Sequence, residues 1–130
     1  LKVPILAAGC ISTGRQVLAS LGLGAQLCYI GTRFIASDEC GAQDAYKAKV
    51  CSSSPEDIVY TDKVSGIHAN FIKDTVPEDF SSERTPEGAK RWKDIWSAGQ
   101  GVAQVGEVLP IGEIVERLAR EAHEAYAKLG

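Results

Sequence analysis

Two turns, at Gly9 and Gly31, carry the residues whose types and spacing suggest chemistry. Residues 3–12 read VPILAAGCIS and residues 25–34 read AQLCYIGTRF. Each segment is a short apolar run that ends at a glycine and continues into a helical pattern. Two such turns side by side present a nest of backbone N–H groups, which is a typical phosphate-binding arrangement. The residues expected to contact the phosphate are Gly9, Cys10, Gly31 and Thr32, whose hydroxyl adds one donor.

A simpler interpretation of the same turns is that both glycines only end strands. Strand–glycine–helix turns are common, so spacing alone leaves both interpretations open. Arg33 follows the second turn and would add a positive charge to a phosphate site. We favour the alternative that Arg33 points to solvent or joins an ion pair.

Other polar residues give weaker signals. His68 has no identifiable neighbour that would orient it as a base, so we expect an ordinary loop histidine. His123 is expected on the surface of the last helix, and Gln100, between two glycines, is only a weak candidate ligand contact. The sequence therefore predicts no catalytic residue and no metal ligand set in this chain.

The elements that would position the two turns form a strand–helix–strand unit. Residues 3–8 and 26–30 read as buried parallel strands, with a helix between them whose apolar positions include Val17, Leu18 and Leu21. The cap of this helix is Ser12 or Thr13, and its end lies at Gly22 and Gly24. In (β/α)8 barrels, the loops after the last two strands often form a phosphate site, so this unit suggests such a barrel.

The middle of the chain is harder to interpret. We expect one helical turn over 32–37, a helix over 41–51 capped by Ser37 or Asp38, and a strand over 58–61. Residues 62–90 show no regular pattern, as in a functional or mobile loop. A short amphipathic helix is predicted over 90–96, carrying Trp92 and Trp96 on one face for core packing, and residues 97–101 read as a flexible turn.

The last helix is the clearest prediction. Pro110 suits a first turn, and the following apolar residues recur at helical spacing, which indicates a face that packs on the core. These residues are Ile111, Ile114, Val115, Leu118, Ala122, Ala125 and Leu129. Favourable ion pairs four residues apart are expected at Glu113–Arg117, Glu116–Arg120 and Glu124–Lys128.

Composition narrows the class of protein. The chain has 130 residues and a formal net charge of −3, which gives no basic field for nucleic acid. No apolar run approaches the roughly 18 residues that a membrane-spanning helix requires. The four cysteines (Cys10, Cys28, Cys40 and Cys51) lack metal-site spacing, and we expect reduced thiols in a cytoplasmic protein.

Four segments taken together resemble the nitronate monooxygenases, formerly called 2-nitropropane dioxygenases. They are AAGCIS at 7–12, YIGTRF at 29–34, SGI with ANF at 65–71, and WKDIWSAGQG at 92–101. The similarity covers nearly all of this chain but only the C-terminal third to half of a family member. The resemblance implies an α/β fold, the C-terminal part of an FMN-binding (β/α)8 TIM barrel with part of a smaller second lobe.

The resemblance also implies a function and a site. The family oxidises alkyl nitronates with FMN and molecular oxygen, the flavin supplying the redox chemistry. By resemblance, Gly9 and Cys10 lie in the first FMN-phosphate loop, and the second contains Tyr29, Ile30, Gly31 and Thr32. The expected partners are a small nitronate and O2, with no nucleic acid or membrane.

Two departures from the family pattern matter. The family usually has a second glycine where this chain has Cys10. A cysteine is accommodated there if its φ is negative, and it adds strain of about 1–3 kcal/mol if its φ is positive. The family's catalytic histidine lies in a glycine-rich motif upstream of this region, and His68 is not that residue. We therefore expect an incomplete chain with little or no monooxygenase activity.

The expected organisation has three parts. Residues 1–52 supply the last βα units of the barrel with the phosphate loops, residues 53–101 a loop-rich segment and small lobe, and residues 102–130 a helix packed on the barrel. Two alternatives stay open: a flavin-dependent enoyl-acyl-carrier-protein reductase-like enzyme, and a non-catalytic phosphate- or flavin-binding half-barrel. Exposed strand edges would favour self-association of such a half-barrel or pairing with an N-terminal half.

Overall fold

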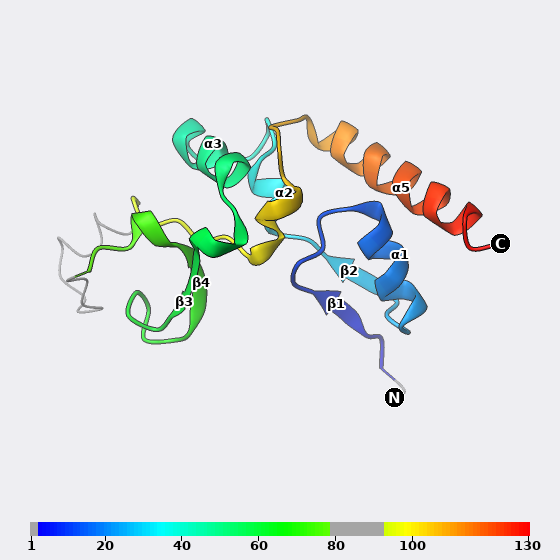
Figure 1. The fold of residues 1–130 in the computed structure, drawn as a ribbon, viewed down its shortest axis with the longest axis horizontal. Coiled ribbons are helices and arrows are strands. Elements are labelled where there is room, and N and C mark those ends of the chain that lie inside the picture. Colours follow the sequence, from blue (N-terminus) through cyan, green and yellow to red (C-terminus); the bar gives the residue numbers. More distant parts are fainter. Residues whose placement is uncertain (1–2, 79–92) are drawn as a thin grey trace.

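The computed structural model describes residues 3–78 and 93–130. The chain is drawn out along one axis, with two small sheets at opposite sides and short helices between them (Figure 1). One side holds a parallel sheet of β1 (Leu6–Ala8) and β2 (Leu27–Tyr29), with helices α1 (Gly14–Gly22) and α5 (Ile111–Ala127). The other side holds an antiparallel sheet of β3 (Ile58–Thr61) and β4 (Ala69–Ile72). Helices α2 (Thr32–Ile35) and α3 (Asp44–Ser52) lie between the two sheets.

The predicted parallel strand–helix–strand unit is confirmed. β1 (Leu6–Ala8) pairs with β2 (Leu27–Tyr29) in parallel, and α1 (Gly14–Gly22) connects them. Both strands are shorter than the predicted 3–8 and 26–30. Thr13 caps α1 through a reciprocal arrangement, since its own N–H donates to Oε1 of Gln16 at 3.0 Å while its hydroxyl accepts from the N–H of Gln16.

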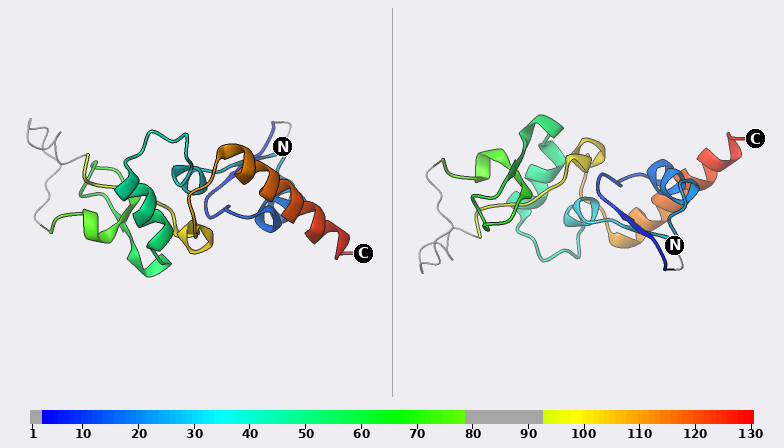
Figure 2. Two further views of the ribbon diagram at one scale, coloured as in Figure 1. Left: turned by 90° about the horizontal axis from the view of Figure 1, so that it is seen from above. Right: turned by 90° about the horizontal axis from the view of Figure 1, so that it is seen from below.

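Helix α5 (Ile111–Ala127) packs directly on α1, as all views show (Figures 1 and 2). The two helices meet at Gly14, where an added Cβ would lie 2.1 Å from the carbonyl oxygen of Leu118. The N–H of Gly14 donates to Oε2 of Glu121 at 2.7 Å. Glycine at this position is therefore what lets the backbones of α1 and α5 approach so closely.

The predicted apolar face of α5 is only partly buried. Ile114 is 1% exposed, whereas Val115 is 51% and Leu129 is 79% exposed. Pro110 is the residue that precedes the helix rather than one in its first turn. Of the predicted ion pairs, Glu113–Arg117 is present at 3.3 Å.

The other two predicted ion pairs of α5 are not seen. Arg120 lies 3.9 Å from Glu124 instead of pairing with Glu116, and Lys128 forms no ion pair within the described residues.

The second sheet contains one strand that the sequence predicted and one that it did not. β3 (Ile58–Thr61) is confirmed, and β4 (Ala69–Ile72) pairs with it in antiparallel register. β4 lies inside the segment 62–90 that was expected to lack regular structure, so that expectation is wrong for these residues. β4 reads ANFI and has one β-branched residue, whereas β3 reads IVYT and has three, so only β3 carries a local strand signal.

The predicted helix over 90–96 is wrong in its described part, residues 93–96. These residues make a turn and then run extended beside β4: the N–H of Ile72 donates to the carbonyl of Trp96 at 2.8 Å, and Phe71 forms a bridge with Ser97. Pairing with a strand more than twenty residues away overrides the local helical pattern. Trp92 lies outside the described residues.

The helices between the sheets pack around one apolar core. α2 (Thr32–Ile35) is the predicted single turn, and α3 (Asp44–Ser52) begins later than expected, after Gln43 rather than after Ser37 or Asp38. The buried residues of this core come from the end of α2, from α3 and β4, and from the 3-10 helix Gln100–Gln104 with its flanking residues. They are Ala36, Val50, Ile72, Ala98, Val102 and Val105.

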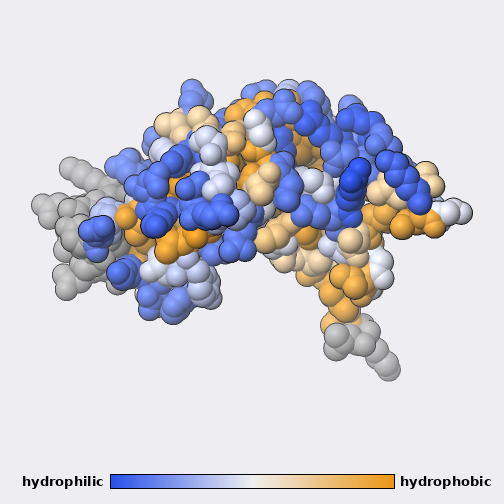
Figure 3. Space-filling model, viewed as in Figure 1, coloured by the Kyte–Doolittle hydropathy of each residue, from blue (hydrophilic) through white to orange (hydrophobic). Residues whose placement is uncertain are grey.

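One face of the β1–β2 sheet is bare, so the prediction that both strands are buried is wrong for this face. Leu6, Leu27 and Tyr29 are 52%, 57% and 66% exposed, whereas α1 covers the opposite face. Apolar surface gathers where β1 runs toward the N-terminus, at the lower right of Figure 3. Burying this face would require further structure that packs on it.

No helix in the described part of the chain is both long and apolar enough to cross a membrane.

Candidate functional site

A cavity of about 270 Å³ lies where β1 and β2 end at their glycine turns. Five of the six residues predicted to bind the cofactor line it, and Ile30 does not. The lining residues are Ala8, Gly9, Cys10, Ile11, Ser12, Tyr29, Gly31, Thr32, Gly99 and Gly101. Parallel pairing of the strands brings the two turns to the same end of the sheet, which is why residues far apart in the sequence share one cavity.

The first turn has an unusual backbone. Gly9 has φ +97° and Cys10 has φ +54°, both in the left-handed region. Of the two cases considered for Cys10, the strained one therefore applies, because its φ is positive. A cysteine in this conformation costs on the order of 1–3 kcal/mol, and the surrounding structure must hold it there.

The second turn presents backbone donors. Gly31 caps α2, and Thr32 is its first residue. The backbone N–H groups of Cys10, Gly31 and Thr32 have no hydrogen-bond acceptor within residues 3–78 and 93–130. The two turns thus place donors without partners around one small cavity, which is the property that an anion requires.

A third segment, predicted from its sequence as a flexible turn, completes the cavity. The N–H of Gly99 donates to Oγ1 of Thr32 at 2.9 Å, and Oγ of Ser12 donates to the carbonyl of Gly101 at 3.1 Å. These contacts tie the segment to both turns at once.

The two glycines of this segment are required by space. An added Cβ at Gly101 would lie 2.8 Å from Oγ of Ser12 and 3.3 Å from Cα of Cys10, and one at Gly99 would lie 3.3 Å from Oγ1 of Thr32. The sequence Gly99-Gln100-Gly101 indicates a close approach of the backbone to another segment. It does not indicate which segment that is.

Arg33 does not contribute charge to the cavity. It is 5% exposed, and its Nη1 donates to the carbonyl oxygens of Glu107 at 3.0 Å and Ala36 at 3.4 Å. Burial lowers the pKa of its guanidinium from the usual range. The expectation of a solvent-facing or ion-paired Arg33 is wrong, and no residue that lines the cavity carries a charge at neutral pH.

The remaining candidates lie away from the cavity. His68 precedes β4 and lies against Tyr60, with ring centroids 5.0 Å apart, so it is a loop histidine as predicted. His123 is exposed on α5, also as predicted. All four cysteines are free thiols, and no group of three or more potential ligands among the described residues is placed to hold a metal ion.

The fold and the cavity define an α/β chain that corresponds to part of a (β/α)8 barrel with glycine loops at the ends of two neighbouring strands. The family model described as nitronate monooxygenase matches residues 1–121. The chain therefore belongs to the nitronate monooxygenase family, as its resemblance predicted.

Curated relatives agree with this family. A probable nitronate monooxygenase of Staphylococcus saprophyticus is 29% identical over 95% of this chain, and a nitronate monooxygenase of Paraburkholderia phytofirmans is 25% identical over 98%. In both cases the match covers 40% of the relative. The chain thus spans less than half the length of the curated relatives it matches.

Solved structures give the same result. FabK from Thermotoga maritima matches with a TM-score of 0.79 and 27% identity, covering 99% of this chain and 47% of FabK. A nitroalkane oxidase from Streptomyces ansochromogenes matches with a TM-score of 0.79 and 28% identity, covering 100% of this chain and 42% of that protein. The described fold is therefore a recurrent part of larger enzymes.

Proposed function

We propose that the cavity binds the phosphate group of FMN, and that the chain acts as the phosphate-binding part of a flavin-dependent enzyme that oxidises alkyl nitronates with O2. The observation that carries the proposal is the set of unpartnered backbone N–H groups of Cys10, Gly31 and Thr32 around one cavity. Family membership supports the flavin, since the family resemblance implies an FMN enzyme.

The lining residues fit a phosphate in size and in chemistry. Small residues at the turns leave the backbone accessible, and hydrogen bonds from such donors to a charged group contribute about 1.5–3 kcal/mol each. Thr32 accepts the Gly99 N–H through Oγ1, which leaves its own hydroxyl proton free to donate to a phosphate oxygen. The lining carries no charged side chain, so backbone dipoles and one hydroxyl supply the recognition.

The bound flavin would supply the redox chemistry, and the residues of this chain would hold and orient it. We propose that residues 1–52 form the barrel units with the phosphate loops, residues 53–101 the small lobe, and residues 102–130 the helix that closes on α1. We expect the isolated chain to show little or no nitronate oxidation, because no histidine, carboxylate or lysine of the described residues lines the cavity.

Fluorescence titration with FMN tests the proposal. We expect saturable quenching of the flavin, competition by inorganic phosphate, and loss of binding in Gly31→Asp. Gly31 lines the cavity and an added Cβ there meets no atom within 4 Å, so the substitution adds a negative charge beside the cavity without a clash at Cβ. The matched control is Gly31→Asn, which has the same shape without the charge and should retain most of the affinity.

Equal FMN binding by Gly31→Asp and Gly31→Asn in folded samples would show that the phosphate does not lie at this turn. No binding by the parent chain, together with no recovery in Cys10→Gly, would show that the described residues do not make a sufficient phosphate site.

A flavin-dependent reductase is the second candidate, because the proposed phosphate contacts would serve either enzyme and the cavity lining contains nothing that selects a substrate. The same FMN titration would succeed for either enzyme. Consumption of NADH or NADPH by the protein loaded with FMN, without nitronate, would favour the reductase. Oxygen consumption that depends on an alkyl nitronate would favour the nitronate oxidation proposed here.

A further inference from the structure

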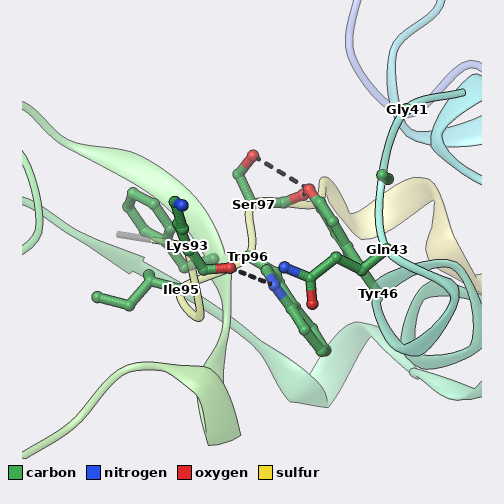
Figure 4. Close-up of a pocket in the computed structure, with 9 residues that line it drawn as sticks. Gly41, Gln43, Tyr46, Lys93, Ile95, Trp96 and Ser97 are labelled. Atoms are coloured by element: carbon green, nitrogen blue, oxygen red, sulfur yellow. Dashed lines mark hydrogen bonds between the residues drawn. The ribbon is translucent and has the colours of Figure 1, made fainter. Parts of the chain in front are cut away.

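A second cavity lies away from the phosphate cavity, between the start of α3 and the extended segment 93–97. It has a volume of about 500 Å³, within the usual range for small-molecule sites. Figure 4 shows Gln43 and Tyr46 on the α3 side, and Lys93, Ile95, Trp96 and Ser97 on the opposite side. This cavity shares no lining residue with the phosphate cavity.

The walls of this second cavity are fixed by hydrogen bonds. The rings of Tyr46 and Trp96 stack with centroids 5.1 Å apart and planes inclined by 10°. The hydroxyl of Tyr46 donates to the carbonyl of Ser97, and Nε1 of Trp96 donates to the carbonyl of Lys93 at 3.1 Å (Figure 4). The backbone N–H of Trp96 donates to Oγ1 of Thr75 at 3.0 Å. A ligand would thus meet preorganised aromatic walls, which reduces the entropy lost on binding.

The polarity of the cavity changes from floor to rim. Phe71 and Ile95 are buried at 4% and 6% exposure and make an apolar floor. Gln43 and Lys93 are exposed at the rim. Lys93 is the only residue with a charged side chain at neutral pH among the described residues that line the cavity. Burial raises the pKa of Tyr46, which keeps its hydroxyl neutral there.

We propose that this second cavity binds a small organic acid that carries a flat apolar ring. The ring would lie over the apolar floor and against the stacked Tyr46–Trp96 pair, and the carboxylate would stay at the rim near Lys93 and the Gln43 amide. A cation beside an apolar surface suits a ligand that has both a carboxylate and an apolar ring, because hydrogen bonds between charged partners are stronger than those between neutral ones. The site is independent of the flavin proposal.

The test uses the full chain and 2-naphthoate as the probe, with 2-naphthamide as its uncharged analogue. Binding is followed by NMR through the indole N–H signal of Trp96, assigned with Trp92→Phe. We expect saturable shifts with a dissociation constant of about 1 mM or below for 2-naphthoate, and binding at least about tenfold weaker for the amide. FMN titration of the same samples reports the phosphate cavity separately.

Two variants probe the site, each with a matched control. Lys93→Gln should weaken 2-naphthoate binding about tenfold, whereas Lys128→Gln on the distant C-terminal helix should not. Gly41 lines the cavity and an added Cβ there meets no atom within 4 Å, so Gly41→Phe adds a ring to the cavity wall without a clash at Cβ and should weaken binding. An added Cβ at Gly106 also meets no atom within 4 Å, but Gly106 does not line the cavity, so Gly106→Phe should leave binding unchanged.

Three results would overturn the proposal: no shift of the Trp96 signal at several millimolar probe, equal binding of acid and amide, or equal binding by Lys93→Gln and the parent chain. Shifts confined to the bare β1–β2 face would also overturn it, because they would show nonspecific adsorption to exposed apolar surface. Retained FMN binding in any of these cases would leave the proposed function intact.

Discussion

Replacing Gly101 with alanine tests whether segment 99–101 positions the first turn of the cavity at Gly9 and Gly31. The added Cβ would lie 2.8 Å from Oγ of Ser12 and 3.3 Å from Cα of Cys10. A Cβ cannot approach this oxygen to 2.8 Å, so either the Ser12 side chain turns away and loses its hydrogen bond to Gly101, or the first turn and the third segment move apart by a few tenths of an ångström. Cys10 already has a left-handed backbone, so the turn has little freedom to adjust locally.

The expected magnitude follows from the interactions that this separation disrupts. It weakens the hydrogen bond from Ser12 to the carbonyl of Gly101, worth about 1 kcal/mol net, and overpacking at a close backbone approach adds about 1–3 kcal/mol. If the movement withdraws one N–H donor from the phosphate, the loss of about 1.5–3 kcal/mol weakens FMN binding roughly tenfold to a hundredfold.

The assay is FMN titration by fluorescence, combined with urea unfolding of the same variant. The matched control is Gly106→Ala, because an added Cβ at Gly106 meets no atom within 4 Å. The double variant Ser12→Ala/Gly101→Ala removes the nearest clash and should cost less than the sum of the two single changes. An FMN affinity of Gly101→Ala within about twofold of the parent would refute the view that this segment positions the first turn.

Three further predictions concern stability and pH. Cys10→Gly relieves a left-handed cysteine and should raise the free energy of unfolding by about 1 kcal/mol, measured in urea; an unchanged or lower value would contradict the strain assigned to this residue. Gly14→Ala should destabilise by about 1–3 kcal/mol or more where α1 meets α5, whereas Gly22→Ala, with free space, should not; equal effects would argue against the close helix contact. Burial raises the pKa of Tyr46 in the folded protein above its unfolded pKa of about 10. The protonated hydroxyl therefore contributes stability that is fully present below the unfolded pKa and is lost as the pH rises through the folded pKa. Unfolding free energies measured from pH 8 to 11 should therefore fall less steeply in Tyr46→Phe, and identical slopes would remove Tyr46 as the cause.

Local patterns predicted the parts of the fold that local interactions decide. The helix cap at Thr13 and the start of its helix follow from a serine/threonine residue with a glutamine three positions later, a pattern that acts within one turn. The strand at Ile58–Thr61 follows from β-branched and aromatic residues between polar loops. The turns at Gly9 and Gly31 were predicted from their glycines, and parallel pairing of the two strands places both turns at one cavity.

The errors concern residues whose environment depends on distant partners. Trp92 and Trp96 are four positions apart in the sequence, a helical spacing, yet the carbonyl of Trp96 accepts a hydrogen bond from Ile72, and residues 95–97 run beside β4. Arg33 was expected at the surface because isolated arginines usually are, but carbonyl oxygens of Ala36 and Glu107 hold it in the interior. No local pattern reveals a partner 74 positions away.

The segment 96–101 explains why the candidate site needs more than its two turns. Trp96 joins it to β4, Ser97 accepts from Tyr46 of α3, Gly99 donates to Thr32, and Gly101 accepts from Ser12. One short segment therefore connects the second sheet to both phosphate turns. Because these contacts lie within six residues, displacing the segment at one of them should affect the others. The cavity at the two glycine turns is consequently a product of the tertiary fold, and if it binds FMN as proposed, its affinity should depend on contacts well outside the cavity.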